Sequence, residues 1–103
     1  MGSLPVNSSV HSAQDLRQVN AILVDPRDPK IVFAAGPAGV FRSNDSGLNW
    51  QSNSEGLDTA AIVALALNPD QPDALFAATA EGALFRSDDG AKTWHSIHTT
   101  ASP

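Results

Sequence analysis

FRSNDSGLNW, residues 41–50, returns as FRSDDGAKTW at residues 85–94 of a chain of 103 residues. A ten-residue phrase repeated 44 positions later indicates that the chain contains two copies of one structural unit. The residues that recur include serine and aspartate, which build turns, and both copies carry a glycine within the same stretch. The repeat therefore predicts two similar hairpins, and it does not by itself indicate a function.

The similarity extends well beyond the quoted phrase, from residues 20–51 to residues 63–95. The offset is 43 positions through most of this stretch and becomes 44 at the phrase itself, because one residue is inserted between Gly82 and Phe85. A hairpin loop beside a glycine absorbs such an insertion easily. The matched positions outside the phrase are Asp25-Pro26 with Asn68-Pro69, Pro29 with Pro72, Phe33-Ala34-Ala35 with Phe76-Ala77-Ala78, and Gly39 with Gly82.

Each copy divides into four short apolar segments separated by turn residues, and no stretch free of turn residues is long enough for a convincing helix. The sequence predicts an all-β chain. In each copy the first segment is apolar at consecutive positions, as in Ile22, Leu23 and Val24, which predicts a strand covered on both faces. An apolar first strand followed by more polar strands is typical of a propeller blade. The predicted strands are residues 19–24, 30–35, 40–43 and 48–52 in the first copy, and 61–67, 74–78, 83–87 and 92–97 in the second.

The repeated phrase fits the pattern Ser-x-Asp-x-Gly-x-x-Trp. Ser43 and Asp45 are expected to bond backbone groups across a tight turn, and Gly47 allows the positive φ that such a turn needs. Trp50 then returns on the next strand, where its ring can pack over the turn and between sheets.

This pattern resembles the motif of the Asp-box, or BNR-repeat, β-propellers, a family that includes sialidases, Vps10 domains and photosystem II assembly factors. The resemblance covers about residues 19–98. It implies that the Asp-boxes lie on the outer hairpin between the third and fourth strands of each blade, away from the central axis. Ala91 stands where the motif glycine is expected, so Gly90 is predicted to take over the unusual backbone torsion. The residues assigned to the structural Asp-boxes are Ser43, Asp45, Gly47, Trp50, Ser87, Asp89, Gly90 and Trp94.

The predicted organisation has four parts. Residues 1–18 form an N-terminal arm, either a disordered leader or a strand that latches onto a neighbouring chain. Residues 19–55 form the first Asp-box blade and residues 56–98 the second, followed by a C-terminal tail at residues 99–103.

Composition and residue types exclude several functions. The net charge is −5 and the six Lys and Arg residues are scattered, so no basic stripe is available for nucleic acid. The apolar runs are too short to span a membrane, and the three histidines are too loosely spaced to indicate a metal site. A sialidase would need a tyrosine nucleophile, and the sequence has no tyrosine. We therefore predict a protein that is not an enzyme and has no cofactor, metal, nucleic-acid partner or membrane span.

Two blades do not make a propeller, because closed rings contain about 4–8 blades and an open pair leaves apolar faces exposed. The sequence predicts that the chain closes the ring with copies of itself, with a trimer or tetramer favoured, and acts as a protein-binding or assembly scaffold. Two alternatives stay open: a fragment of a larger Asp-box glycoside hydrolase or sialidase-like propeller, and an engineered minimal-repeat propeller. The candidate face for a protein partner consists of Glu55, Asp58, Thr59, Thr79 and Glu81.

Overall fold

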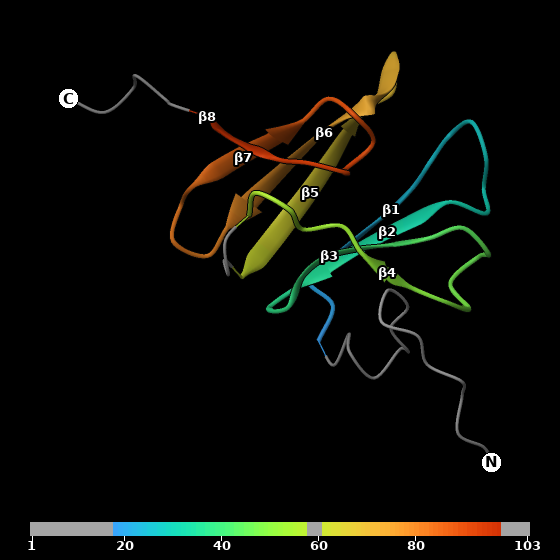
Figure 1. Cartoon of the computed structure of the whole chain (residues 1–103), viewed down its shortest axis with the longest axis horizontal. Coiled ribbons are helices and arrows are strands. Elements are labelled where there is room, and N and C mark those ends of the chain that lie inside the picture. The colour runs from blue at the N-terminus through green and yellow to red at the C-terminus, as the bar shows by residue number, and fades with distance from the viewer. Residues whose placement is uncertain (1–17, 58–60, 98–103) are drawn as a thin grey trace.

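The computed structural model describes residues 18–57 and 61–97, which form two four-stranded antiparallel sheets (Figure 1). The all-β prediction is confirmed, with one sheet for each copy of the repeat. The predicted arm, apart from Gln18, and the C-terminal tail lie outside the described residues. No helix in the described part of the chain has the length and apolar character needed to cross a membrane. The first sheet contains β1 (Ala21–Val24), β2 (Val32–Gly36), β3 (Gly39–Ser43) and β4 (Gln51–Ser52), and the second contains β5 (Ile62–Asn68), β6 (Gln71–Thr79), β7 (Leu84–Ser87) and β8 (His95–Ile97).

Both sheets are simple meanders, in which each strand pairs with the next along the chain. One difference between them lies in the loop between the second and third strands. In the first sheet Gly36 pairs directly with Gly39, which leaves a two-residue hairpin loop. In the second sheet the backbone N–H of Thr79 donates to the carbonyl of Ala83, so the loop is longer. The inserted residue is therefore accommodated in this loop without disturbing the strands.

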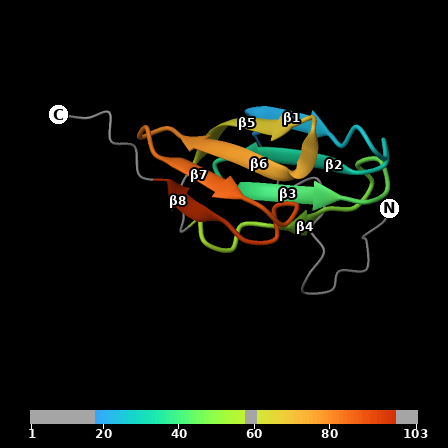
Figure 2. The same cartoon turned by 90° about the horizontal axis from the view of Figure 1, so that it is seen from above.

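The two sheets stack face to face, with β5 against β1 and β2 (Figure 2). We call the side of each sheet that faces the other its inner face. Burial of the apolar side chains on the two inner faces is the main stabilising contribution to the pair of sheets. The shared core contains Phe33, Ala35 and Val40 from the first sheet, Ile62, Leu75, Ala77, Phe85, Ala91 and Trp94 from the second, and Leu57 from the connection between them.

The opposite sides, which we call the outer faces, have no second sheet to cover them within the described residues. In β1, Leu23 packs against the shared core, whereas Ile22 is 62% exposed and Val24 is 53% exposed. The expectation that the first strand is covered on both faces is thus met on one face only in this chain. The consecutive apolar residues remain without the second covering layer that their sequence pattern predicts.

Candidate functional site

The first Asp-box turn joins β3 to β4 and is organised by the side chain of Ser43, which is 1% exposed. Its hydroxyl accepts hydrogen bonds from the backbone N–H groups of Gly47 at 2.8 Å and Asp45 at 3.2 Å, and donates to Oδ1 of Asp45 at 2.7 Å. The Asp45 carboxylate also accepts from the backbone N–H of Asn49 at 2.9 Å and from its side-chain amide at 2.8 Å. These bonds reverse the chain, so that Trp50 returns into a cluster of buried side chains on the outer face of the first sheet.

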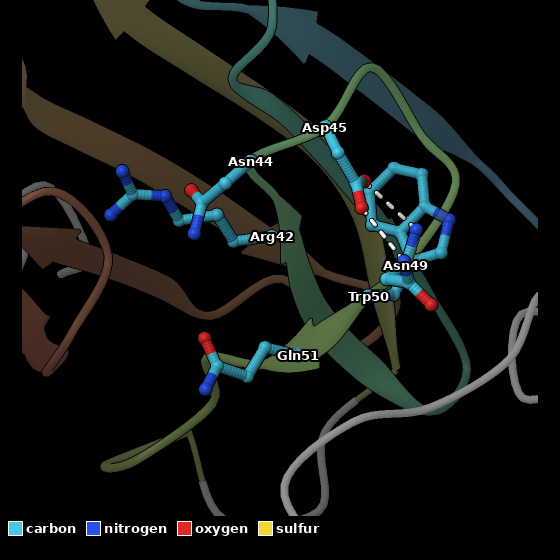
Figure 3. Close-up of a pocket in the computed structure, with 6 residues that line it drawn as sticks. All are labelled: Arg42, Asn44, Asp45, Asn49, Trp50 and Gln51. Atoms are coloured by element: carbon cyan, nitrogen blue, oxygen red, sulfur yellow. Dashed lines mark hydrogen bonds between the residues drawn. The ribbon is translucent and has the colours of Figure 1, made fainter. Parts of the chain in front are cut away.

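A polar hollow of about 220 Å³ lies beside this turn (Figure 3). Asp45, Asn49 and Trp50 gather on one side of it, while the side chain of Arg42 extends away from them. Among the described residues, the buried Nε of Arg42 has no hydrogen-bond partner. Its guanidinium carbon lies 5.8 Å from the centre of the Phe33 ring. The hollow is smaller than typical small-molecule sites, and the carboxylate on its wall is already satisfied by the turn.

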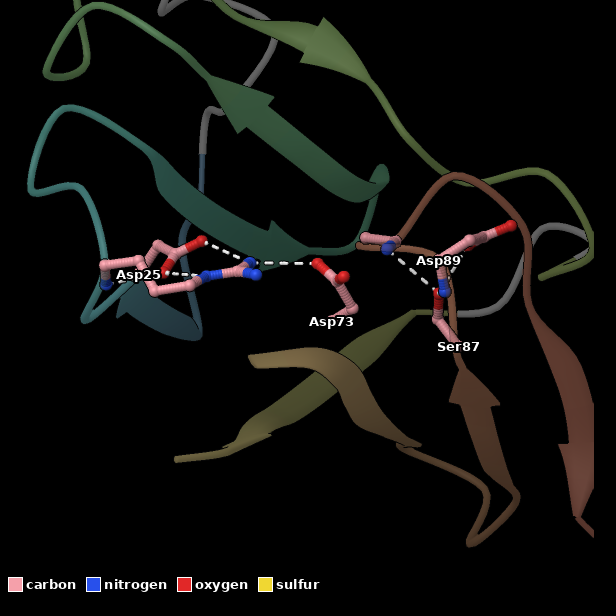
Figure 4. A network of polar contacts seen from close by, with 6 residues as sticks. Asp25, Asp73, Ser87 and Asp89 are labelled. Atoms are coloured by element: carbon pink, nitrogen blue, oxygen red, sulfur yellow. Dashed lines mark hydrogen bonds and ion pairs between the residues drawn. The ribbon is translucent and has the colours of Figure 1, made fainter. Parts of the chain in front are cut away.

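The second Asp-box turn, between β7 and β8, repeats the arrangement (Figure 4). The hydroxyl of Ser87 accepts from the backbone N–H groups of Ala91 at 2.9 Å and Asp89 at 3.3 Å, and donates to Oδ1 of Asp89 at 2.8 Å. The backbone N–H and the hydroxyl of Thr93 donate to the Asp89 carboxylate at 3.0 Å and 2.6 Å. Trp94 then packs into the core between the sheets. All of these polar groups are used within the turn.

The backbone of the second turn differs from the sequence prediction. Gly90 has a φ of 74°, as predicted, but Ala91 also adopts a positive φ of 75°. In the first turn the corresponding residues Ser46 and Gly47 have φ values of 65° and 96°. Both turns therefore require two successive left-handed residues, and each supplies glycine at only one of them. Gly90 does not relieve Ala91, because both backbone N–H groups are held: that of Ala91 donates to the hydroxyl of Ser87, and that of Gly90 donates to the carbonyl of Asp73.

Hydrogen bonding keeps both Asp-box carboxylates ionised. The side chain and backbone of Asn49, followed by Ser43, lower the pKa of Asp45 to about 2. The side chain and backbone of Thr93 lower the pKa of Asp89 to about 2 in the same way. A carboxylate that accepts several hydrogen bonds is stabilised in its charged form. These pKa values are a property of the turns and do not indicate acid–base catalysis.

A polar contact between the sheets involves Arg27, which the sequence pattern did not single out. The guanidinium of Arg27 binds the carboxylate of Asp25, with Nη2 to Oδ2 at 2.9 Å, and extends to Oδ1 of Asp73 in the second sheet at 2.9 Å (Figure 4). Asp25 is 4% exposed, and hydrogen bonds from Arg27 lower its pKa against the opposing effect of burial. An opposite charge 46 residues away in sequence gives no local signal, which is why this ion pair was not anticipated.

The residues of the candidate partner-binding face differ in their availability. Glu55 and Glu81 are exposed. Thr79 is 4% exposed, and its hydroxyl accepts a hydrogen bond from the backbone N–H of Ala83 at 3.0 Å, so it serves the loop after β6. Asp58 and Thr59 lie outside the described residues. The described part of this face thus provides two exposed acidic side chains.

No group of three or more His, Asp or Glu residues that could hold a metal ion occurs among residues 18–57 and 61–97. The two Asp-box aspartates lie in separate turns and are each bound by neighbouring side chains.

The repeat allows each outer face to be compared with an inner face. By the repeat, the outer face of the first sheet corresponds to the inner face of the second, and the inner face of the first sheet corresponds to the outer face of the second. Val40 of the first sheet is 0% exposed because the second sheet covers it, whereas its counterpart Leu84 is 37% exposed. Conversely, Leu65 and Leu67 of the second sheet pack against the shared core, whereas their counterparts Ile22 and Val24 are 62% and 53% exposed. Each outer face therefore carries exposed apolar side chains whose equivalents inside the chain are covered. The cluster of Val32, Ala34, Phe41 and Trp50 on the outer face of the first sheet is itself buried.

Comparison with known proteins links this geometry to a family. A family model described as Sortilin, neurotensin receptor 3, matches residues 38–103. Among solved structures, YCF48 from Cyanidioschyzon merolae matches with a TM-score of 0.67 and 18% sequence identity over 82% of this chain. The chain spans 27% of the length of that structure. A search of curated proteins found no match.

Proposed function

This chain belongs to the Sortilin-Vps10 family, and from that premise we propose that it is a non-enzymatic β-propeller module that completes its ring by binding copies of itself. The observation that carries the proposal is the correspondence between the outer faces and the internal interface. Three apolar residues on the outer faces, Ile22, Val24 and Leu84, are substantially exposed, whereas their counterparts pack between the two sheets. Such faces are unfavourable in water and are typical of surfaces that bind another protein.

A cyclic assembly satisfies both outer faces at once. Each copy presents the outer face of its first sheet and the outer face of its second sheet, so the contact is head-to-tail and each chain adds two blades. Three copies would give six blades and four copies eight, within the usual range of about 4–8 blades. We favour the trimer or tetramer over a ring of five copies, which would exceed this range.

The proposed role of the ring is to bind or assemble other proteins. The exposed acidic residues Glu55 and Glu81 favour a protein partner, because the face they occupy offers no exposed aromatic side chain for stacking on a sugar ring. Catalysis by this chain is not proposed. The Asp-box carboxylates are engaged in their turns, and the sequence contains no tyrosine to act as a sialidase nucleophile.

A second candidate follows from the coverage of the solved structure. Because the chain matches only 27% of the YCF48 chain, it also fits a piece of a longer propeller whose remaining blades lie on the same polypeptide. A glycoside hydrolase of the sialidase type is one such protein, with its catalytic residues on other blades.

Substitution of Ile22 by glutamate tests the proposed assembly. Ile22 is 62% exposed, so the folded chain tolerates the change, but a charge would be buried if the outer face of the first sheet meets a second copy. Leu48, which is 77% exposed in the first Asp-box turn, provides the matched control Leu48→Glu. We expect light scattering to show the Leu48→Glu chain as an oligomer and the Ile22→Glu chain as a 10.7 kDa monomer. An Ile22→Glu chain with the same mass as the Leu48→Glu chain would contradict the proposed contact.

A further inference from the structure

The turn after the first strand has the same local geometry in both sheets, and it carries opposite charges. In the first sheet the backbone N–H of Arg27 donates to Oδ1 of Asp25 at 2.8 Å. In the second sheet the backbone N–H of Asp70 donates to Oδ1 of Asn68 at 2.9 Å. These residues are related by the repeat offset of 43 positions. Asp70 therefore occupies the position in the second sheet that Arg27 occupies in the first.

The beginning of the next segment is also equivalent in the two sheets. The carbonyl oxygen of Lys30 accepts from the backbone N–H of Ser46 at 2.9 Å, which ties this segment to the first Asp-box turn. The carbonyl oxygen of Asp73 accepts from the backbone N–H of Gly90 at 3.0 Å, which ties it to the second Asp-box turn. Lys30 therefore occupies the position in the first sheet that Asp73 occupies in the second.

Inside the chain these positions meet across the interface between the sheets, where Arg27 pairs with Asp73 at 2.9 Å. If the same interface forms between two copies, Asp70 on the second sheet of one copy faces Lys30 on the first sheet of the next. The pair has opposite charges again, with the signs exchanged. Within the described residues neither the Lys30 ammonium nor the Asp70 carboxylate has an ion-pair partner, and both residues are exposed.

A hydrogen-bond donor on the outer face of the first sheet fits the same register. Inside the chain the indole Nε1–H of Trp94 donates to the carbonyl of Asn53 at 2.9 Å, across the interface between the sheets. The equivalent indole, that of Trp50, is 7% exposed, and its Nε1–H has no acceptor in the described part of the chain. The counterpart of Asn53 is Ile97 at the end of β8. In a repeated interface the carbonyl of Ile97 in the next copy would accept this hydrogen bond.

We infer that the outer face of the second sheet docks onto the outer face of the first sheet of a second copy, in the register of the internal interface, with an ion pair between Asp70 and Lys30. This inference rests on the proposed self-assembly and specifies its register and polarity. The ion pair is exposed and contributes little to affinity, but like charges placed in contact would oppose the wrong register. Apolar contact drives the association, and the charges select which faces meet.

Charge reversal tests the pair directly. The variants are Lys30→Asp, Asp70→Lys and the double variant that carries both changes. Each single variant places two like charges at every interface, and we expect self-association about fivefold weaker per interface by analytical ultracentrifugation. The double variant restores an opposite pair and is expected to associate within about twofold of the unmodified chain.

Lys92→Asp and Glu81→Lys provide matched controls, because they change the net charge by the same amounts at exposed positions on other loops. We expect both controls to associate like the unmodified chain. Raising the salt concentration to about 1 M should reduce the difference in self-association between the single variants and the controls, since screening weakens the interaction between exposed charges. An equimolar mixture of the two single variants should associate more strongly than either alone, because each contact between two different variants restores opposite charges.

The outcomes separate this inference from the proposed function. If the unmodified chain assembles and the single variants match their controls, the Asp70–Lys30 pair is refuted while self-assembly stands. A double variant that associates no better than the single variants would also refute the pair. An unmodified chain that remains a monomer would overturn the proposed self-assembly, and this register with it.

Discussion

Replacing Ser87 by alanine is expected to destabilise the chain by about 2–4 kcal/mol. The hydroxyl of Ser87 is the acceptor for the backbone N–H of Ala91 at 2.9 Å, and both residues are 0% exposed. Leaving a buried donor without a partner costs about 1–3 kcal/mol. The lost bond from the hydroxyl to the Asp89 carboxylate at 2.8 Å adds about 1 kcal/mol, because that carboxylate retains its two bonds from Thr93.

Urea unfolding followed by tryptophan fluorescence measures this loss. Ser96 offers a matched control, since it is exposed on β8 and its hydroxyl makes no hydrogen bond to another described residue. The Ser96→Ala variant is expected to stay within about 0.5 kcal/mol of the unmodified chain. Equal free energies of unfolding for Ser87→Ala and Ser96→Ala would refute the view that the buried hydroxyl organises the Asp-box turn.

Three further predictions concern the turns and the interface between the sheets. The pKa values of Asp45 and Asp89 are lowered from 3.8 to about 2 on folding, so the stability they contribute is complete at neutral pH and is lost as the pH falls from about 4 to 2. Urea titrations across this range should show the loss, and variants with asparagine at both positions should show a flatter profile; identical profiles would rule out the linkage. Gly47→Ala is expected to cost about 1 kcal/mol, because the residue has a φ of 96°; an unchanged unfolding midpoint would contradict that strain. Arg27→Ala leaves the carboxylate of Asp25 buried without its cation, so thermal unfolding should reveal a loss of about 1–3 kcal/mol, and no loss would show that the ion pair is dispensable.

The sequence repeat predicted the fold well because the information was local and occurred twice. Each apolar segment is bounded by turn residues, and the Asp-box pattern fits the hairpin between the last two strands of each sheet. The backbone of the second turn was harder to predict. Gly90 is an obvious site for a positive φ, but the sequence pattern does not indicate that Ala91 also has a positive φ.

The contacts between the sheets could not be read from the sequence in the same way. The pairing of Arg27 with Asp73 depends on how the two sheets stack, which local patterns do not specify. The same holds for Thr79, whose hydroxyl is taken up by its own loop rather than displayed on a surface. Once the internal interface was known, the repeat became informative again, because it relates contacts between the sheets to positions on the outer faces.

The most direct test of the account is the mass of the full chain in solution, measured by light scattering after size exclusion over a range of concentrations. The account predicts one discrete species at a whole-number multiple of 10.7 kDa, with three or four copies. A species that stays at 10.7 kDa at every concentration would contradict it, and would show that the outer faces are not completed by copies of this chain.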